Sequence, residues 1–352
     1  MKFRKALRPL MIILILACVI SGALFFWLYS ALHRPISHGS SGTYITIEEG
    51  SSSNKILKKL EEQQILQASL ATKIYLKFSN TDNKMEAGDY KFPSPFSPIE
   101  LLSQLRQGKK RTKTLTIPEG WTRFEIAKRI AKAFPVTPAL SEKDILALMD
   151  NTSLIQELDA NAKNLEGYLY PTTYQFELGT HPRDVIAKMV QQFKTVWQAE
   201  WDGSLLEIGR TKNEIVIIAS LIENESKLDA ERDLVASVIY NRLEREIPLG
   251  IDATNVYIAK MLGRWDGIIH KSDVEVDHPY NTRKIRGLPP GPICSPSSTA
   301  IEAALNPAKT ENIYYVLNVA ANDGSHHFYS SASDFAKGKA DYQKWLANQR
   351  GK

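Results

Sequence analysis

Two glutamates stand one residue apart at the end of a strongly apolar run. The run covers residues 215–222, and Glu223, Asn224 and Glu225 follow it directly. An apolar environment disfavours the ionised form of a carboxyl group, and so does the negative end of a helix dipole. Both effects raise a carboxyl pKa, so a glutamate here can hold a proton near neutral pH and donate it. The segment predicts a general acid, and these residues alone leave Glu223 and Glu225 as alternatives.

The ordinary alternative is that both carboxylates are solvated, or paired with Arg232 or Arg242. In the next apolar stretch Val235, Val238 and Ile239 form one helical face, and Arg242 lies on that face beside Asn241. A cation on a buried face usually has a carboxylate or a ligand as its partner. Arg242 therefore favours a functional site over a solvated helix end.

A third set of polar groups follows in a loop expected over residues 248–257. It contains Asp252, Thr254 and Tyr257 among apolar neighbours. Sugar ligands require hydrogen-bonding groups beside apolar surface, and this loop offers both.

The expected elements that position these groups are mostly helices. Because the glutamate-bearing run is apolar all round, residues 213–226 should form a helix buried on every side. Further helices are expected at 182–200 and 230–245. Residues 165–176 mix aromatics with Gly and Pro and predict strand and turn, and residues 313–319 predict a late strand.

The amino terminus predicts a membrane anchor. Residues 10–32 carry no charge and would form a helix of roughly 35 Å, enough to cross a hydrocarbon core of about 30 Å. The basic tip, residues 1–9, should remain in the cytoplasm, which places the rest of the chain outside the plasma membrane. A cleaved signal peptide and lipid attachment at Cys18 are the alternatives, and the length of the apolar run argues against both.

Beyond the anchor, the chain is expected to form a polar linker over residues 33–42 and two domains, residues 43–112 and 113–352. The first domain should begin with a strand at 44–47 and a Ser-capped helix. The second begins with a similar unit, so the chain contains a weak internal repeat of strand, Gly turn and helix. In this repeat Thr46, Ile47, Glu49, Gly50, Ile56 and Leu60 align with Thr116, Ile117, Glu119, Gly120, Ile126 and Ile130.

Charge and cysteine content limit the kinds of ligand and cross-link that the protein can have. The formal net charge is +5, and the basic tip supplies four of those charges, so the exported part offers no basic surface for nucleic acid. Cys18 lies in the expected anchor and Cys294 stands alone outside it, which leaves no intrachain disulfide and no thiolate metal site. We expect no metal and no cofactor.

Several motifs together resemble the YceG-like endolytic murein transglycosylases, the MltG family. The resemblance extends from the anchor to Trp345. It rests on residues 219–225 (ASLIENE), 231–232, 235–238, 241–243, 280–282, 287–293, 295–296, 307–310 and 327–328, together with 116–120 and 165–176. Many family members have Leu-Gln-Ser-Asp-Pro-Thr where this chain has residues 249–254 (LGIDAT), which leaves in doubt any contact made by the Gln side chain.

The resemblance implies an α+β protein with one transmembrane helix, a small LysM-like module and a larger, mostly helical catalytic domain. It implies cleavage of nascent peptidoglycan glycan strands, with peptidoglycan synthases as candidate partners. The second glutamate of the family's Glu-x-Glu pair is catalytic, which maps to Glu225. The implied supporting or substrate-binding residues are Glu223, Ser226, Asn241, Arg242, Asp252, Thr254, Tyr257, Asn281 and Thr282.

One carboxyl group suffices for this reaction. Ordinary glycosidases use two, one to protonate the leaving oxygen and one to attack or to activate water. In a lytic transglycosylase the C6 hydroxyl of MurNAc attacks its own C1, so one glutamate can donate and then accept the proton. A hydrolytic muramidase and a non-catalytic, membrane-tethered peptidoglycan-binding scaffold remain as alternatives.

Overall fold

The computed structural model describes residues 2–39, 44–48, 50–79, 85–108, 112–197 and 199–350. The chain divides into two compact units, Met1–Lys113 and Thr114–Lys352, which are described separately below. Met1, the last part of the expected linker and Glu49 of the internal repeat lie outside the described residues.

The first unit begins with a long helix, α1 (Lys2–His33). Its stretch Met11–His33 has a mean hydropathy of 2.7 in its most apolar window, and none of that window is buried. By length and composition this helix can cross a membrane, in agreement with the anchor predicted for residues 10–32.

The rest of the first unit is a small α+β module. Strands β1 (Ile45–Ile47) and β2 (Gly88–Tyr90) pair antiparallel, and three helices complete the module. The predicted strand and Ser-capped helix are confirmed, because Ser52 caps α2 and accepts a hydrogen bond from the Lys55 N–H at 3.4 Å. The helices are α2 (Ser53–Glu62), α3 (Ser69–Ser79) and α4 (Pro98–Gln107).

The second unit begins with the other copy of the repeat. Strand β3 (Thr112–Thr116) pairs with β4 (Thr173–Glu177). The chain then turns at Gly120, where φ is +72°, and enters α5 (Arg123–Ala133). Between α5 and β4 lie α6 (Glu142–Met149) and the 3-10 turn η1 (Thr152–Ile155). The strand predicted within residues 165–176 is confirmed by β4.

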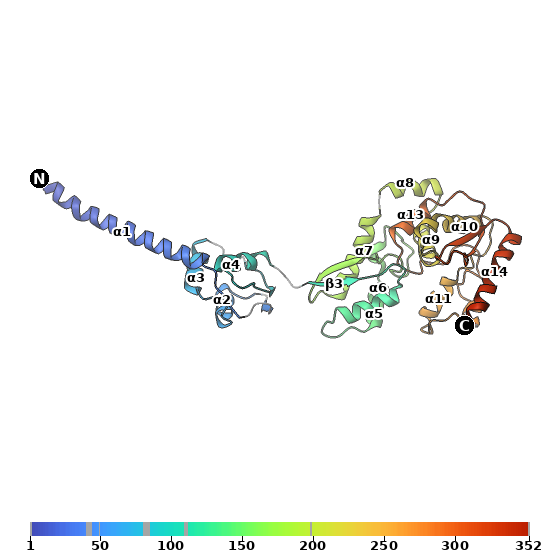
Figure 1. The fold of residues 1–352 in the computed structure, drawn as a ribbon, viewed down its shortest axis with the longest axis horizontal. Helices are drawn as coiled ribbons and strands as arrows, with labels where there is room; N and C mark the ends of the chain where they lie inside the picture. The colour runs from blue at the N-terminus through green and yellow to red at the C-terminus, as the bar shows by residue number, and fades with distance from the viewer. Residues whose placement is uncertain are drawn as a thin grey trace. The chain divides into compact units, whose positions relative to one another are not determined.

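Helix α9 (Lys212–Glu225) carries the glutamate pair and lies beside α10 and α13 in Figure 1. Every residue from Ile215 to Ile222 in α9 is buried, as predicted, and α9 packs against α10 and α13. The other helical elements between β4 and β5 are α7 (Pro182–Val196), α8 (Ala199–Ile208), the 3-10 turn η2 (Asp229–Glu231), α10 (Arg232–Glu244), α11 (Asp252–Met261), α12 (Lys271–Glu275) and α13 (Ser298–Leu305).

Two boundaries among these helices differ from the sequence prediction. The helix expected over 182–200 ends at Val196, because Trp197 adopts an extended backbone, and α8 follows as a separate helix. The loop expected over 248–257 is also wrong in its second half, because α11 begins at Asp252.

A β-hairpin and a long helix complete the unit. Strands β5 (Tyr314–Leu317) and β6 (His326–Tyr329) pair antiparallel, with Tyr315 opposite Phe328. The late strand predicted at 313–319 is therefore confirmed. Helix α14 (Ala332–Arg350) packs against both strands. The mixed α+β architecture expected from the sequence is confirmed.

Candidate active site

Glu225 is the last residue of α9 and lines a cavity of about 250 Å³. Ser226, the next residue, leaves the helix with an extended backbone and is buried. Asp252 and Tyr257 of α11 line the same cavity. The buried helix thus ends at a space that three of the predicted site residues share.

Two groups donate hydrogen bonds to the Glu225 carboxyl group. The Tyr315 hydroxyl donates to Oε2 at 2.5 Å, and the backbone N–H of Ala253 donates from the first turn of α11. Burial is the largest influence on this group and raises the pKa of Glu225 to about 7, with the Asp252 carboxylate adding to the rise. The hydrogen bonds and the Arg283 cation oppose the rise. Glu225 therefore exchanges a proton near neutral pH.

Glu223 lies in a different environment. The Arg232 guanidinium donates to both carboxylate oxygens of Glu223, at 2.8 and 3.1 Å. The backbone N–H and the hydroxyl of Ser297 donate to Oε2 at 2.9 and 2.5 Å. The Glu223 side chain is only 5% exposed. Glu223 is thus held in a buried ion pair, which ties α9 to α10 and α13.

Arg242 contacts backbone carbonyls and not the acid. Its Nε donates to Ile313 O at 2.6 Å, and its Nη1 donates to Leu249 O at 2.6 Å. The guanidinium also lies over the Tyr314 ring, 5.3 Å from the ring centroid. Arg242 therefore joins the start of the hairpin to the loop before α11, and so positions the two segments that lead to Tyr315 and Ala253, the residues that contact Glu225.

The remaining predicted polar residues hold loops together. Asn241 donates to the carbonyls of Thr310 and Asn312, each at 2.8 Å. Asn281 donates to two carbonyls near α12. The Thr254 and Thr282 hydroxyls lie 3.1 Å apart and are fully buried. The structure places these four side chains around the site as its framework, and it places none of them in the cavity lining.

Asp252 and Tyr257 differ in exposure. Asp252 is exposed and forms an ion pair with Arg283. Tyr257 is 2% exposed and hydrogen-bonds to Glu166, another buried carboxyl group. Burial raises the pKa of Glu166 to about 7, although both of its oxygens accept from the Arg123 N–H. A second buried acid therefore lies behind Tyr257.

Sequence reasoning missed Tyr315, Lys260 and Thr122. Lys260 and Thr122 line the cavity with Glu225, and Lys260 forms an ion pair with Glu125 at 2.7 Å. Tyr315 lies in the predicted late strand, where an aromatic residue is ordinarily part of the core. Tyr315 gains its role only because its strand lies against the end of α9. A contact between residues so far apart in the sequence is not visible in a local pattern.

A hydrogen-bonded pair, Glu231 and His326, supports Tyr315 from the side. The His326 ring meets the Tyr315 ring edge to face, with centroids 5.6 Å apart. Glu231 accepts from the backbone N–H and from Nδ1 of His326, at 2.8 and 2.9 Å. The hairpin is thus fastened to η2 beside the residue that contacts the acid.

In the part of the chain that the structure describes, no group of three or more His, Cys, Asp or Glu side chains is placed to hold a metal ion. Cys294 is buried, and its thiol donates to Ser220 O at 3.3 Å. Burial raises the pKa of this thiol well above its usual value.

Comparisons with a family model and with curated relatives agree on one family. The model of the YceG-like family matches residues 45–341. An endolytic murein transglycosylase of Bacillus subtilis strain 168 is 30% identical over 344 residues, which cover 92% of this chain and 91% of that protein. A protein of the same name from Streptococcus pneumoniae strain D39 is 30% identical over 329 residues. The chain spans 59% of the length of that pneumococcal relative.

The fold has a counterpart among solved structures. The crystal structure of a YceG-like protein from Listeria monocytogenes superimposes with a TM-score of 0.57 at 30% sequence identity. The match covers 84% of this chain and 98% of that one.

Proposed function

The chain belongs to the YceG-like family, and on that premise we propose that it is a lytic transglycosylase that cuts peptidoglycan glycan strands internally. The observation that carries the proposal is the position of Glu225. Its carboxyl group lines a cavity, accepts from Tyr315 at 2.5 Å and has a pKa raised to about 7. The relatives named as endolytic murein transglycosylases support the substrate class.

In the proposed reaction Glu225 acts twice. Protonated Glu225 gives its proton to the oxygen that links MurNAc to GlcNAc, and the bond from that oxygen to C1 of MurNAc breaks. The C6 hydroxyl of the same MurNAc attacks C1, and its proton passes to the Glu225 carboxylate. The products are a 1,6-anhydro-MurNAc end and a free GlcNAc hydroxyl, and the enzyme regains its starting protonation state. A pKa near the working pH suits both steps.

The neighbouring groups set the position and the pKa of the Glu225 carboxyl group. Tyr315 and the Ala253 N–H fix the carboxyl group in place, and the Asp252 carboxylate favours the protonated form. We assign Tyr257, Lys260 and Asp252 to substrate contact, because their side chains line the cavity.

The parts of the chain before the catalytic unit determine where we expect the protein to act. We propose that α1 anchors the protein in the plasma membrane by a single span, with the amino terminus in the cytoplasm and the chain after α1 outside. The small module that follows the anchor, residues 43–112, would act as a LysM-like peptidoglycan-binding module. Peptidoglycan synthases are the candidate protein partners.

Mass spectrometry of purified glycan strands after incubation with the full-length protein in detergent tests the proposal. The wild type should produce anhydro ends, and Glu225→Gln should produce none while unfolding at a temperature no lower than the wild type. Glu207→Gln, an exposed glutamate on α8, is the matched control. Reducing ends in place of anhydro ends would identify a hydrolytic muramidase, and intact glycan with the wild type would identify a scaffold.

A further inference from the structure

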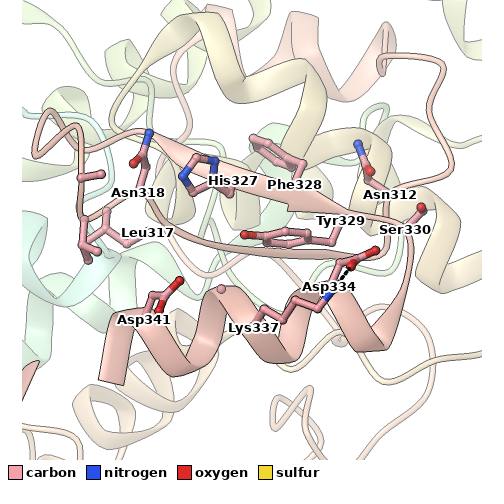
Figure 2. Close-up of a pocket in the computed structure, with 13 residues that line it drawn as sticks. Asn312, Leu317, Asn318, His327, Phe328, Tyr329, Ser330, Asp334, Lys337 and Asp341 are labelled. Atoms are coloured by element: carbon pink, nitrogen blue, oxygen red, sulfur yellow. Dashed lines mark hydrogen bonds and ion pairs between the residues drawn. The ribbon is translucent and has the colours of Figure 1, made fainter. Parts of the chain in front are cut away.

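Charge is arranged differently on two exposed helices of the protein. In α14, which borders a cavity of about 530 Å³ between the helix and the hairpin, Asp334 and Lys337 form an ion pair at 2.9 Å (Figure 2). In α3 of the small module, Lys73 and Lys77 are both exposed. Among the residues that the structure describes, neither of these two lysines lies in an ion pair. The charges of Asp334 and Lys337 therefore cancel within α14, whereas α3 presents two free ammonium groups.

The same side of α3 exposes large apolar side chains. Leu70 is 63% exposed and Phe78 is 85% exposed, and Ile74 between them is half-buried. Positions four residues apart lie above one another on a helix, so these three side chains form one stripe, with Lys73 and Lys77 along its edge. The opposite side of α3 is buried in the module through Ala71, Thr72 and Leu76.

The other two helices of the module expose only polar side chains. The exposed residues are Asn54, Lys55, Lys58, Glu61 and Glu62 on α2, and Glu100, Ser103 and Gln107 on α4. Single exposed apolar residues are ordinary on a protein surface, whereas an apolar patch rimmed by polar residues marks an interaction site. The stripe on α3 therefore indicates a partner outside the module.

Helix α3 lies beside the carboxyl end of α1, the helix that we propose spans the membrane (Figure 1), and the two helices are in contact. Leu32, near the end of the apolar segment of α1, is 4% exposed, because the module covers it. Trp27 and Tyr29, about one turn earlier, are 46% and 55% exposed. Such aromatic residues are typical of the boundary between the hydrocarbon core and the lipid headgroups. The contact with α1 thus places α3 near this boundary.

We propose that the exposed side of α3, residues 70, 73, 74, 77 and 78, docks on the lipid headgroups of the membrane that α1 spans. Leu70 and Phe78 enter the boundary between headgroups and acyl chains, and the ammonium groups of Lys73 and Lys77 pair with lipid phosphates. An apolar stripe with lysines beside it is typical of helices that lie in the plane of a membrane surface. The inference rests on the proposed anchor and goes beyond it. A single span leaves the module free to tilt, whereas a second attachment fixes which of its faces is turned to the lipid.

Nitroxide labels on the full-length protein, in nanodiscs of phosphatidylcholine and phosphatidylglycerol, test the proposal. The background is Cys18→Ser, which should take up no label because Cys294 is buried. Labels are placed at Phe78→Cys on α3, at Leu24→Cys in the span and at Asn54→Cys on α2. Relaxation by oxygen, which concentrates in lipid, and by a water-soluble nickel chelate gives the depth of each label. The label at residue 78 should lie about 5–10 Å below the lipid phosphates, and the label at residue 54 should lie in water.

The label at residue 24 separates failure of this inference from failure of the anchor. Lipid at residue 24 with water at residue 78 would overturn the inference and leave the anchor standing. Water at both positions would overturn both. Exclusion of oxygen and of the nickel chelate at residue 78 would mean that protein covers the stripe, such as a second copy of the chain, and would also overturn the inference.

The two lysines provide a second readout. A lysine near an anionic membrane surface favours the docked state roughly fivefold, so Lys73→Gln with Lys77→Gln should shift the label at residue 78 toward water. Discs of phosphatidylcholine alone should shift it in the same direction. Lys55→Gln with Lys58→Gln, on the exposed side of α2, is the matched control and should leave its depth unchanged. Equal shifts from both pairs of substitutions would overturn the assignment of Lys73 and Lys77 to lipid phosphates.

Discussion

The Tyr315 hydroxyl donates to Oε2 of Glu225 at 2.5 Å, across 90 residues of sequence. The contact joins the middle of a hairpin strand to the last turn of a buried helix, so one carboxyl oxygen is fixed from a separate element. This hydrogen bond lowers the pKa of Glu225, against the larger opposing effect of burial.

Tyr315→Phe should therefore change the pH dependence of cleavage as well as its rate. Removal of the hydrogen bond raises the Glu225 pKa, so the fall in activity on the alkaline side should move to higher pH. A hydrogen bond to a charged group is worth about 1.5–3 kcal/mol, or roughly one to two pH units. The rate below pH 6 should fall about tenfold, because the carboxyl group is less well positioned. Rate–pH profiles of the variant and of Tyr314→Phe, which should match the wild type, check the prediction.

The raised pKa of Glu225 also predicts how stability depends on pH. The folded state binds this proton more tightly than the unfolded state, since the pKa rises from 4.5 to about 7. The free energy of unfolding should thus fall as pH rises from 4.5 to 7. Glu225→Gln cannot ionise and avoids this loss, so above pH 7 it should be more stable than the wild type, on the order of 3 kcal/mol.

Urea unfolding at pH 4 and pH 8 measures this difference. The advantage of Glu225→Gln should vanish at the lower pH, where the wild-type carboxyl group is protonated in both states. An equal advantage at both values would mean that ionisation of Glu225 is not its source.

The ion pair between Glu223 and Arg232 should support the fold and not the chemistry. Both side chains are nearly buried, at 5% and 6% exposure, so Arg232→Ala leaves a carboxylate without its partner. The Ser297 hydrogen bonds to Glu223 remain, and loss of the charged partner of a buried ion pair typically destabilises a protein by about 3–5 kcal/mol. Chemical unfolding should show this loss for Arg232→Ala and a smaller one for the double variant Glu223→Met, Arg232→Met. Cleavage per folded molecule should persist in the double variant, and its abolition would place Glu223 in the reaction.

The sequence alone predicted the elements that local patterns specify. The apolar run from Ile215 to Ile222 allowed only a fully buried helix, and its acidic end followed directly. The predicted strand at 313–319 depended in the same way on its local composition. The end of α7 at Val196 and the start of α11 at Asp252 were harder to predict. In the sequence, residues in an extended backbone and residues in the first turn of a helix can be of the same types.

The tertiary partners of the acidic residues could be predicted only in part. The sequence offered Arg232 or Arg242 as an ion-pair partner of either glutamate, and the pair of Glu223 with Arg232 is present. Nothing in the sequence indicated the contact of Glu223 with Ser297 or that of Glu225 with Tyr315. Those contacts depend on how α13 and the hairpin pack on α9. Arg242 was correctly placed on a buried face, but its partners are backbone carbonyls, which carry no sequence signal.

Arg242→Lys should reveal how much the reaction depends on the joint between the hairpin and the loop before α11. The planar guanidinium donates to Ile313 O from one nitrogen and to Leu249 O from another, each at 2.6 Å. A lysine ammonium is a single point on a flexible chain and cannot reproduce both contacts in that geometry. Since Ile313 immediately precedes the strand that bears Tyr315, the variant should loosen the contact between Tyr315 and Glu225. We expect kcat to fall about tenfold with KM little changed, and the free energy of unfolding to fall by about 1–3 kcal/mol.

Arg245→Lys, whose exposed partner is Glu311, is the control and should behave as the wild type. A rise in KM at unchanged kcat would instead place Arg242 in substrate binding.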